Sequence, residues 1–128
     1  SQYTADTLIV EQRILSAPSC VQSIPAAADQ EDFVSMGMNG ALKAKQILEN
    51  GRGVLAIELI AAAQALDFRD FRFGKGTQAA HAAVRKVVKH LDKDRPLFKD
   101  HNAMALAVAE CRVLEVVEDA IGPLKSSW

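Results

Sequence analysis

The sequence has few aromatic residues, only 5% of its 128 positions, whereas alanine is plentiful. Alanine has the best helix propensity and lets helix backbones approach one another, so this mixture favours packed helices over sheets. No segment shows a pattern that predicts a strand. At this length, the chain has room for one ordinary domain with a modest core.

An excess of charge of either sign is also lacking, since 15 basic and 16 acidic residues leave a formal charge of −1. Nucleic-acid binding requires a concentrated basic face, so the composition argues against it. One local basic cluster is interrupted by Asp92 and Asp94, and we expect it to be a solvated helix face. Its members are Arg85, Lys86, Lys89, Lys93 and Arg95.

Long apolar runs and cysteine pairs are missing as well. The longest apolar segment, 54–66, contains Glu58 and Gln64 and is too short to cross a bilayer. The N-terminus lacks the pattern of a signal peptide. The two cysteines, Cys20 and Cys111, have no metal-site spacing, and we expect free, buried thiols. These features predict a cytoplasmic protein with no membrane segment and no metal.

Helical periodicity accounts for most of the chain and predicts an all-α fold. Asn50-Gly51-Arg52-Gly53 has the turn chemistry of a helix stop, and Gly122-Pro123 should end the last helix. About five helices are expected, at 3–16, 32–49, 54–68, 76–91 and 100–121.

The segment 54–66 is apolar around nearly its whole circumference, so a helix there should be buried on all sides. The other predicted helices have one apolar stripe each and cannot cover it completely. We therefore expect the chain to self-associate, with this helix at the centre.

Freestanding catalytic machinery is absent: there is no glycine-rich phosphate loop and no nucleophile elbow. His81 and His90 are nine residues apart and would point in different directions on one helix, so they should not share a metal. His101 is expected at the surface. Glu115, Glu118 and Asp119 are expected to be solvated.

The loop 17–31, broken by Pro18 and Pro25, leads into Asp29-Gln30-Glu31-Asp32. One interpretation is structural, with Asp29 or Asp32 capping a helix and the other carboxylates lying in its first turn. The other interpretation is an active-site loop, because long ordered loops are often functional.

Residues 23–36, SIPAAADQEDFVSM, resemble the SIPTSANQEDHVSM signature of the histidine ammonia-lyases. Residues 17–21, 54–59, 63–69 and 91–97 are similar to further segments of that family, in the same order and at its spacing. The resemblance covers about residues 2–100. It extends to the aromatic amino acid ammonia-lyases and aminomutases and identifies the chain as a C-terminal segment of such an enzyme.

The resemblance implies an all-helical homotetramer built around a central helix bundle, which eliminates ammonia from an aromatic amino acid as its small-molecule substrate. The family's electrophile is a methylidene-imidazolone made from an Ala-Ser-Gly tripeptide. No Ala-Ser-Gly occurs in this sequence. The electrophile and the tyrosine base are therefore expected in a missing N-terminal part, and this segment alone should be inactive.

Two residues of the segment match the family's active site. Glu31 matches the glutamate of the substrate pocket, where a carboxylate can pair with an ammonium or imidazole and transfer a proton. Gln30 matches the neighbouring amide, which can orient the substrate. The retained glutamate favours conversion of L-histidine to urocanate.

Two departures from the signature keep other interpretations open. Asp29 stands where the family usually has asparagine, and Phe33 stands where histidine ammonia-lyases have histidine. The alternatives are a tyrosine or phenylalanine ammonia-lyase, an aminomutase of the same fold, or a non-catalytic helical oligomerisation module.

Overall fold

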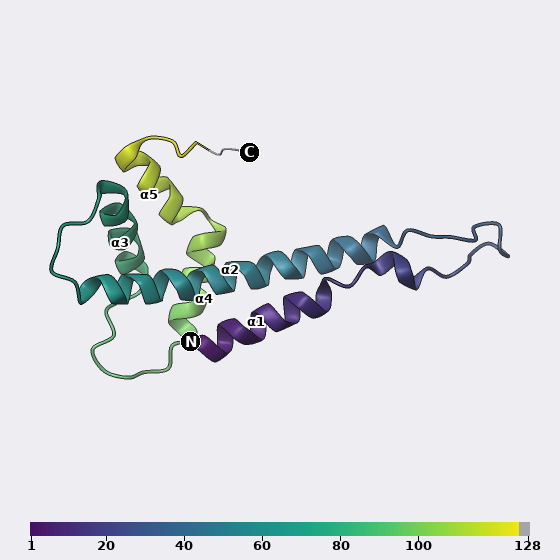
Figure 1. Ribbon diagram of the computed structural model, residues 1–128, viewed down its shortest axis with the longest axis horizontal. Helices are drawn as coiled ribbons and strands as arrows, with labels where there is room; N and C mark the ends of the chain where they lie inside the picture. The colour runs from purple at the N-terminus through teal and green to yellow at the C-terminus, as the bar shows by residue number, and fades with distance from the viewer. Residues whose placement is uncertain (126–128) are drawn as a thin grey trace. The chain divides into compact units, whose positions relative to one another are not determined.

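The computed structural model describes residues 1–125, and these form five α-helices and no strand (Figure 1). The all-α fold predicted from the sequence is confirmed. No helix among the described residues combines the length and hydropathy needed to cross a bilayer. The helices are α1 (Gln2–Leu15), α2 (Gly37–Asp67), α3 (Lys75–Val87), α4 (Phe98–Ala109) and α5 (Arg112–Ile121), with a short 3-10 helix at Ser19–Gln22.

The long helix α2 runs without a break through residues 50–53, so the predicted helix stop is wrong. Contacts with α1 explain the continuity. Asn50 is buried, and its Nδ2 donates a hydrogen bond to Glu11 Oε2 at 2.7 Å. A Cβ atom at Gly51 would lie 3.4 Å from Gln12 Nε2, so the α1 side chain lies directly beside this glycine.

The chain forms two compact units, and the first consists of residues 2–51. Within it, α1 is tied to the first part of α2, since Gln12 Nε2 donates to the backbone oxygen of Ile47 at 3.0 Å. The partly buried face of α1 is the one that periodicity predicts, made of Ala5, Leu8, Ile9, Gln12 and Leu15.

The second unit, from Arg52 onward with Ser1, holds the hydrophobic core. The later part of α2 packs there against α3, α4 and the segment after α3. The fully buried members are Ala56, Ala63, Val84, Val88, Met104 and Ala107. Leu59 and Ile60 pack against this core, but Leu55 is 51% exposed. The described part of the chain therefore does not cover the 54–66 helix on all sides, as the sequence indicates, and its burial by other chains stays a prediction.

The last two predicted helices differ from the observed ones. Helix α3 ends at Val87, and Val88 is extended, so His90 lies outside the helix. The predicted helix 100–121 is divided into α4 and α5 at Cys111, which has a left-handed backbone with φ 57°. Cys20 and Cys111 are both exposed, so the expectation of buried thiols is wrong.

Candidate functional site

The loop between α1 and α2 contains a hairpin made of residues 23–34 (Figure 1). Ala26 and Glu31 exchange two backbone hydrogen bonds, of 2.9 and 3.2 Å. Further from the tip, the backbone N–H of Val34 donates to Ser23 Oγ at 2.7 Å. Two short antiparallel segments thus present the tip residues 27–30.

The backbone of the tip is unusual because three consecutive residues are left-handed. The φ angles are 51° at Ala27, 54° at Ala28 and 66° at Asp29. This region is unfavourable for residues with a Cβ atom, and Asp and Asn tolerate it best. The same backbone therefore suits the asparagine that the family signature has in place of Asp29. Such a turn is retained only where its surroundings hold it.

The structure places Gln30 in this tip and Glu31 directly after it, so we refer to residues 27–31 as the tip region. Gln30 and Glu31 are exposed, and neither side chain makes a hydrogen bond or ion pair within residues 1–125. The capping interpretation is wrong, because α2 begins only at Gly37 and neither Asp29 nor Asp32 caps it. The carboxylates belong to the hairpin and not to a helix.

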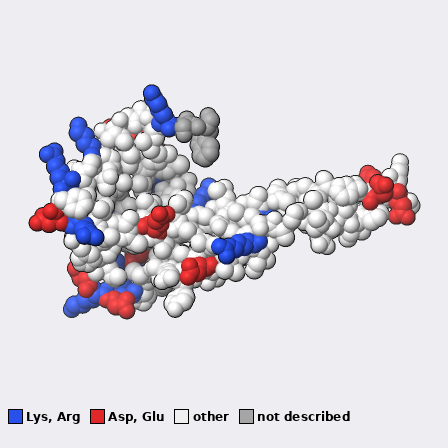
Figure 2. All heavy atoms as spheres, viewed as in Figure 1, with Lys and Arg blue, Asp and Glu red and all other residues white. Residues whose placement is uncertain are grey.

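The tip is strongly acidic for its surroundings. Residues 14–42 contain three carboxylates and no lysine or arginine. Figure 2 shows acidic side chains gathered at the end of this loop, without basic side chains beside them on the visible face. No basic residue nearby in the sequence neutralises the negative charge of these carboxylates, so the tip should attract a cationic group such as an ammonium.

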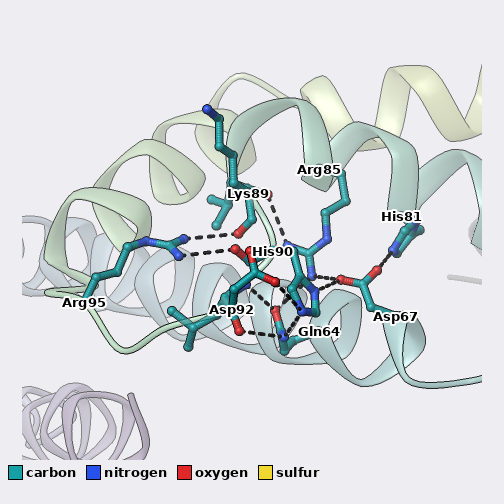
Figure 3. Close-up of polar contacts among 10 residues, drawn as sticks. Gln64, Asp67, His81, Arg85, Lys89, His90, Asp92 and Arg95 are labelled. Carbon is teal, nitrogen blue, oxygen red and sulfur yellow. Dashed lines mark hydrogen bonds and ion pairs between the residues drawn. The ribbon is translucent and has the colours of Figure 1, made fainter.

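A second polar cluster, the Asp67 cluster, lies at the end of α2 and was missed by sequence reasoning (Figure 3). The Asp67 carboxylate is 2.6 Å from His81 Nε2, 2.7 Å from Arg85 Nη2 and 2.5 Å from His90 Nδ1. Burial alone raises the pKa of Asp67. Hydrogen bonds from His90, His81 and Arg85, together with the charge of Arg85, outweigh it and lower the pKa from 3.8 to about 2.

The Asp67 cluster corrects two predictions. His81 and His90 point at the same carboxylate, because α3 ends before His90 and the chain turns back. Arg85 is not on a solvated face, since it also donates to Gln64 Oε1 at 3.2 Å. The available signal was the helical spacing of two polar pairs, Gln64 with Asp67 on α2 and His81 with Arg85 on α3.

The contacts of the Asp67 cluster have a structural role. Gln64 Oε1 also accepts a hydrogen bond from the backbone N–H of Leu91 at 3.0 Å. The cluster therefore fastens the segment after α3 to the end of α2. Within residues 1–125 there is no group of three or more side chains placed to hold a metal ion.

Comparison with known proteins identifies the family. Residues 1–86 match the family model described as aromatic amino acid lyase. This chain belongs to the aromatic amino acid lyase family. The matched range includes the whole hairpin and most of the Asp67 cluster, so both lie in the part of the chain that defines membership.

Curated relatives of this chain are named histidine ammonia-lyase. That of Natranaerobius thermophilus is 48% identical over 98% of this chain, and that of Myxococcus xanthus is 47% identical over 94%. These alignments cover only 25% and 24% of the relatives. The chain therefore spans about a quarter of their length.

Solved structures of the family share the fold. Tyrosine aminomutase from Streptomyces globisporus superposes with a TM-score of 0.90 and 34% identity, covering 96% of this chain and 24% of that one. Histidine ammonia-lyase from Trypanosoma cruzi has a TM-score of 0.86 and 29% identity, covering 98% of this chain and 27% of that one.

Proposed function

We propose that this chain is the C-terminal part of an ammonia-lyase that converts L-histidine to urocanate, and that its hairpin supplies Gln30 and Glu31 to the substrate pocket. The observation that carries the proposal is the placement of both side chains at an exposed, acidic tip, unpaired within the described chain. The histidine ammonia-lyases among the relatives, 43–48% identical, support histidine as the substrate.

The residues of the tip have complementary roles in this proposal. Glu31 pairs with the substrate's ammonium or imidazole and transfers a proton, since an ionised carboxylate is both a counter-charge and a base. The Gln30 amide donates and accepts hydrogen bonds, which orient the substrate beside it. A methylidene-imidazolone would serve as electron sink, and because the sequence has no Ala-Ser-Gly, it would come from outside these 128 residues.

Self-association is part of the proposal, because the tip is exposed and other protein segments must cover it to form an enclosed substrate pocket. Helix α2 also exposes large apolar side chains: Leu42 is 60% exposed, Leu48 56% and Leu55 51%. Exposed apolar surface of this kind marks contacts with other chains. We propose that α2 lies in the central helix bundle of a homotetramer and that the pocket forms where subunits meet.

A second candidate keeps the fold and changes the reaction. The 0.90 TM-score with a tyrosine aminomutase, together with Phe33 in place of the signature's histidine, supports a tyrosine or phenylalanine substrate. Such an enzyme would release coumarate or cinnamate, or return the ammonia to form a β-amino acid.

The test uses a full-length protein that carries this segment, incubated separately with histidine, tyrosine and phenylalanine. We expect urocanate from histidine, and no product from the 128-residue chain alone. Formation of coumarate, cinnamate or a β-amino acid instead would establish the second candidate.

The role of Glu31 is tested by Glu31→Gln in the same protein. We expect turnover to fall roughly 10²-fold or more, as for loss of a general acid or base, with an unchanged melting temperature. Asp32→Asn is the matched control, because it removes a neighbouring charge from the same exposed loop. Equal turnover for the parent and Glu31→Gln would refute the assignment.

A further inference from the structure

The base of the hairpin is partly shielded from water. Residues 24–33 are all exposed, whereas Ser23 and Val34 are partly buried. The hydrogen bond between these two residues, 2.7 Å from Val34 N to Ser23 Oγ, therefore lies at the protected base of the hairpin. The Ala26–Glu31 backbone pair, by contrast, is open to competition from water.

The two contacts belong to one antiparallel register. Ser23 lies three residues before Ala26, and Val34 lies three residues after Glu31, so the two contacts are equally spaced along the two segments, although only the Ala26–Glu31 pair is joined by backbone hydrogen bonds. A shift of pairing by one residue would turn the Glu31 side chain to the opposite face of the hairpin. The direction of Glu31 thus depends on what holds the register.

The backbone conformation of the tip is unfavourable and does not by itself stabilise that register. Its three left-handed residues, Ala27 to Asp29, are in a conformation that non-glycine residues avoid. Such backbone persists only when nearby contacts determine it. The Ser23 hydroxyl, which accepts a hydrogen bond at the base of the hairpin, makes a contact of this kind. Its donor is the backbone N–H of Val34, so the contact does not depend on the rotamer of the Val34 side chain.

We propose that Ser23 is a positioning residue for Glu31: by accepting the Val34 N–H, it holds the register in which the tip presents the carboxylate to the substrate. This inference rests on the proposed function of Glu31. Ser23 itself touches no reacting atom and acts through the backbone of the hairpin.

The contact is tested first without reference to activity, by amide hydrogen exchange in the protein. Ser23→Ala removes the acceptor, so the Val34 and Glu31 amides should exchange at least about tenfold faster, whereas Ser23→Thr keeps a hydroxyl and should restore slow exchange. Ser35→Ala is the matched control, since Ser35 is exposed and its hydroxyl makes no hydrogen bond within residues 1–125. Unchanged exchange in Ser23→Ala would overturn the proposal.

The consequence for catalysis is tested in the full-length protein that carries the segment. Ser23→Ala should lower kcat roughly 10- to 100-fold, as misplacement of a reacting group does, with a much smaller change in KM. Ser23→Thr should recover most of kcat, and Ser35→Ala should leave it unchanged. A purely structural serine would instead lower the melting temperature and spare kcat.

The two hypotheses can fail separately. If Glu31→Gln abolishes turnover while Ser23→Ala retains full kcat, the positioning role is refuted and the proposed function stands. If Glu31→Gln leaves turnover unchanged, the proposed function fails and the positioning role fails with it. The exchange experiment then still reports whether Ser23 holds the hairpin.

Discussion

Replacing Asp67 by asparagine tests how much one carboxylate contributes to the free energy of unfolding of the second unit of the chain. Asp67 is 17% exposed and contacts His81, Arg85 and His90, so it joins the end of α2 to α3 and to the segment after it. Asparagine has nearly the same shape but no charge. The substitution therefore isolates the charge-assisted part of these contacts.

The expected loss of stability in Asp67→Asn follows from the pKa of Asp67, which is about 2 in the folded protein against an ordinary 3.8. A difference of this size corresponds to on the order of 2 kcal/mol of stability. Because the folded pKa is depressed, this contribution is fully present above pH 3.8 and is lost as the pH falls towards 2. About half of it should remain at pH 3.

The assay is urea denaturation of the parent and Asp67→Asn at pH 6 and pH 3. The free energy of unfolding should differ by about 2 kcal/mol at pH 6 and by about 1 kcal/mol at pH 3. Asp92→Asn is the matched control, because Asp92 lies 3.6 Å from His90 but is 84% exposed, and it should change stability by less than about 0.5 kcal/mol. A pH-independent difference, or equal effects of the two substitutions, would refute the reasoning.

Three further predictions concern packing. Met104→Ala should cost roughly 2–5 kcal/mol in urea denaturation because Met104 is fully buried, whereas Leu106→Ala, at a side chain 53% exposed, should cost less than about 1 kcal/mol. Gly40→Ala should raise stability by roughly 0.5–1 kcal/mol, since an added Cβ meets nothing within 4 Å; a lowered melting temperature would contradict this. Leu55→Asp should reduce self-association, measured by sedimentation, while the circular dichroism spectrum stays helical. Leu59→Asp should also unfold the chain, because it places a charge against the core. Unchanged sedimentation of Leu55→Asp would contradict an interface at Leu55.

Local features of the sequence were sufficient for the fold class and for the candidate site residues. Alanine-rich periodicity predicts helices because helix propensity and one apolar stripe act within a few residues of each other. Gln30 and Glu31 are adjacent in a contiguous signature, so they could be found without knowing the fold. Gly122, with φ 85°, ends α5 as its position before a proline predicts.

Tertiary structure decided the features that depend on distant partners. Residues 50–53 stay helical because Asn50 and Gly51 meet α1, and these contacts outweigh the modest helix-breaking tendency of two glycines. The meeting of His81 and His90 at Asp67 required knowing that α3 ends at Val87.

The left-handed residues were equally inaccessible from the sequence. At Ala27 and Cys111, the side chain gives no local reason for a positive φ, so the conformation is imposed by the chain on either side. Sequence pattern thus pointed to the residues of the candidate site, whereas the hairpin that carries them is formed by contacts across it, the Ala26–Glu31 backbone pair and the Ser23–Val34 hydrogen bond.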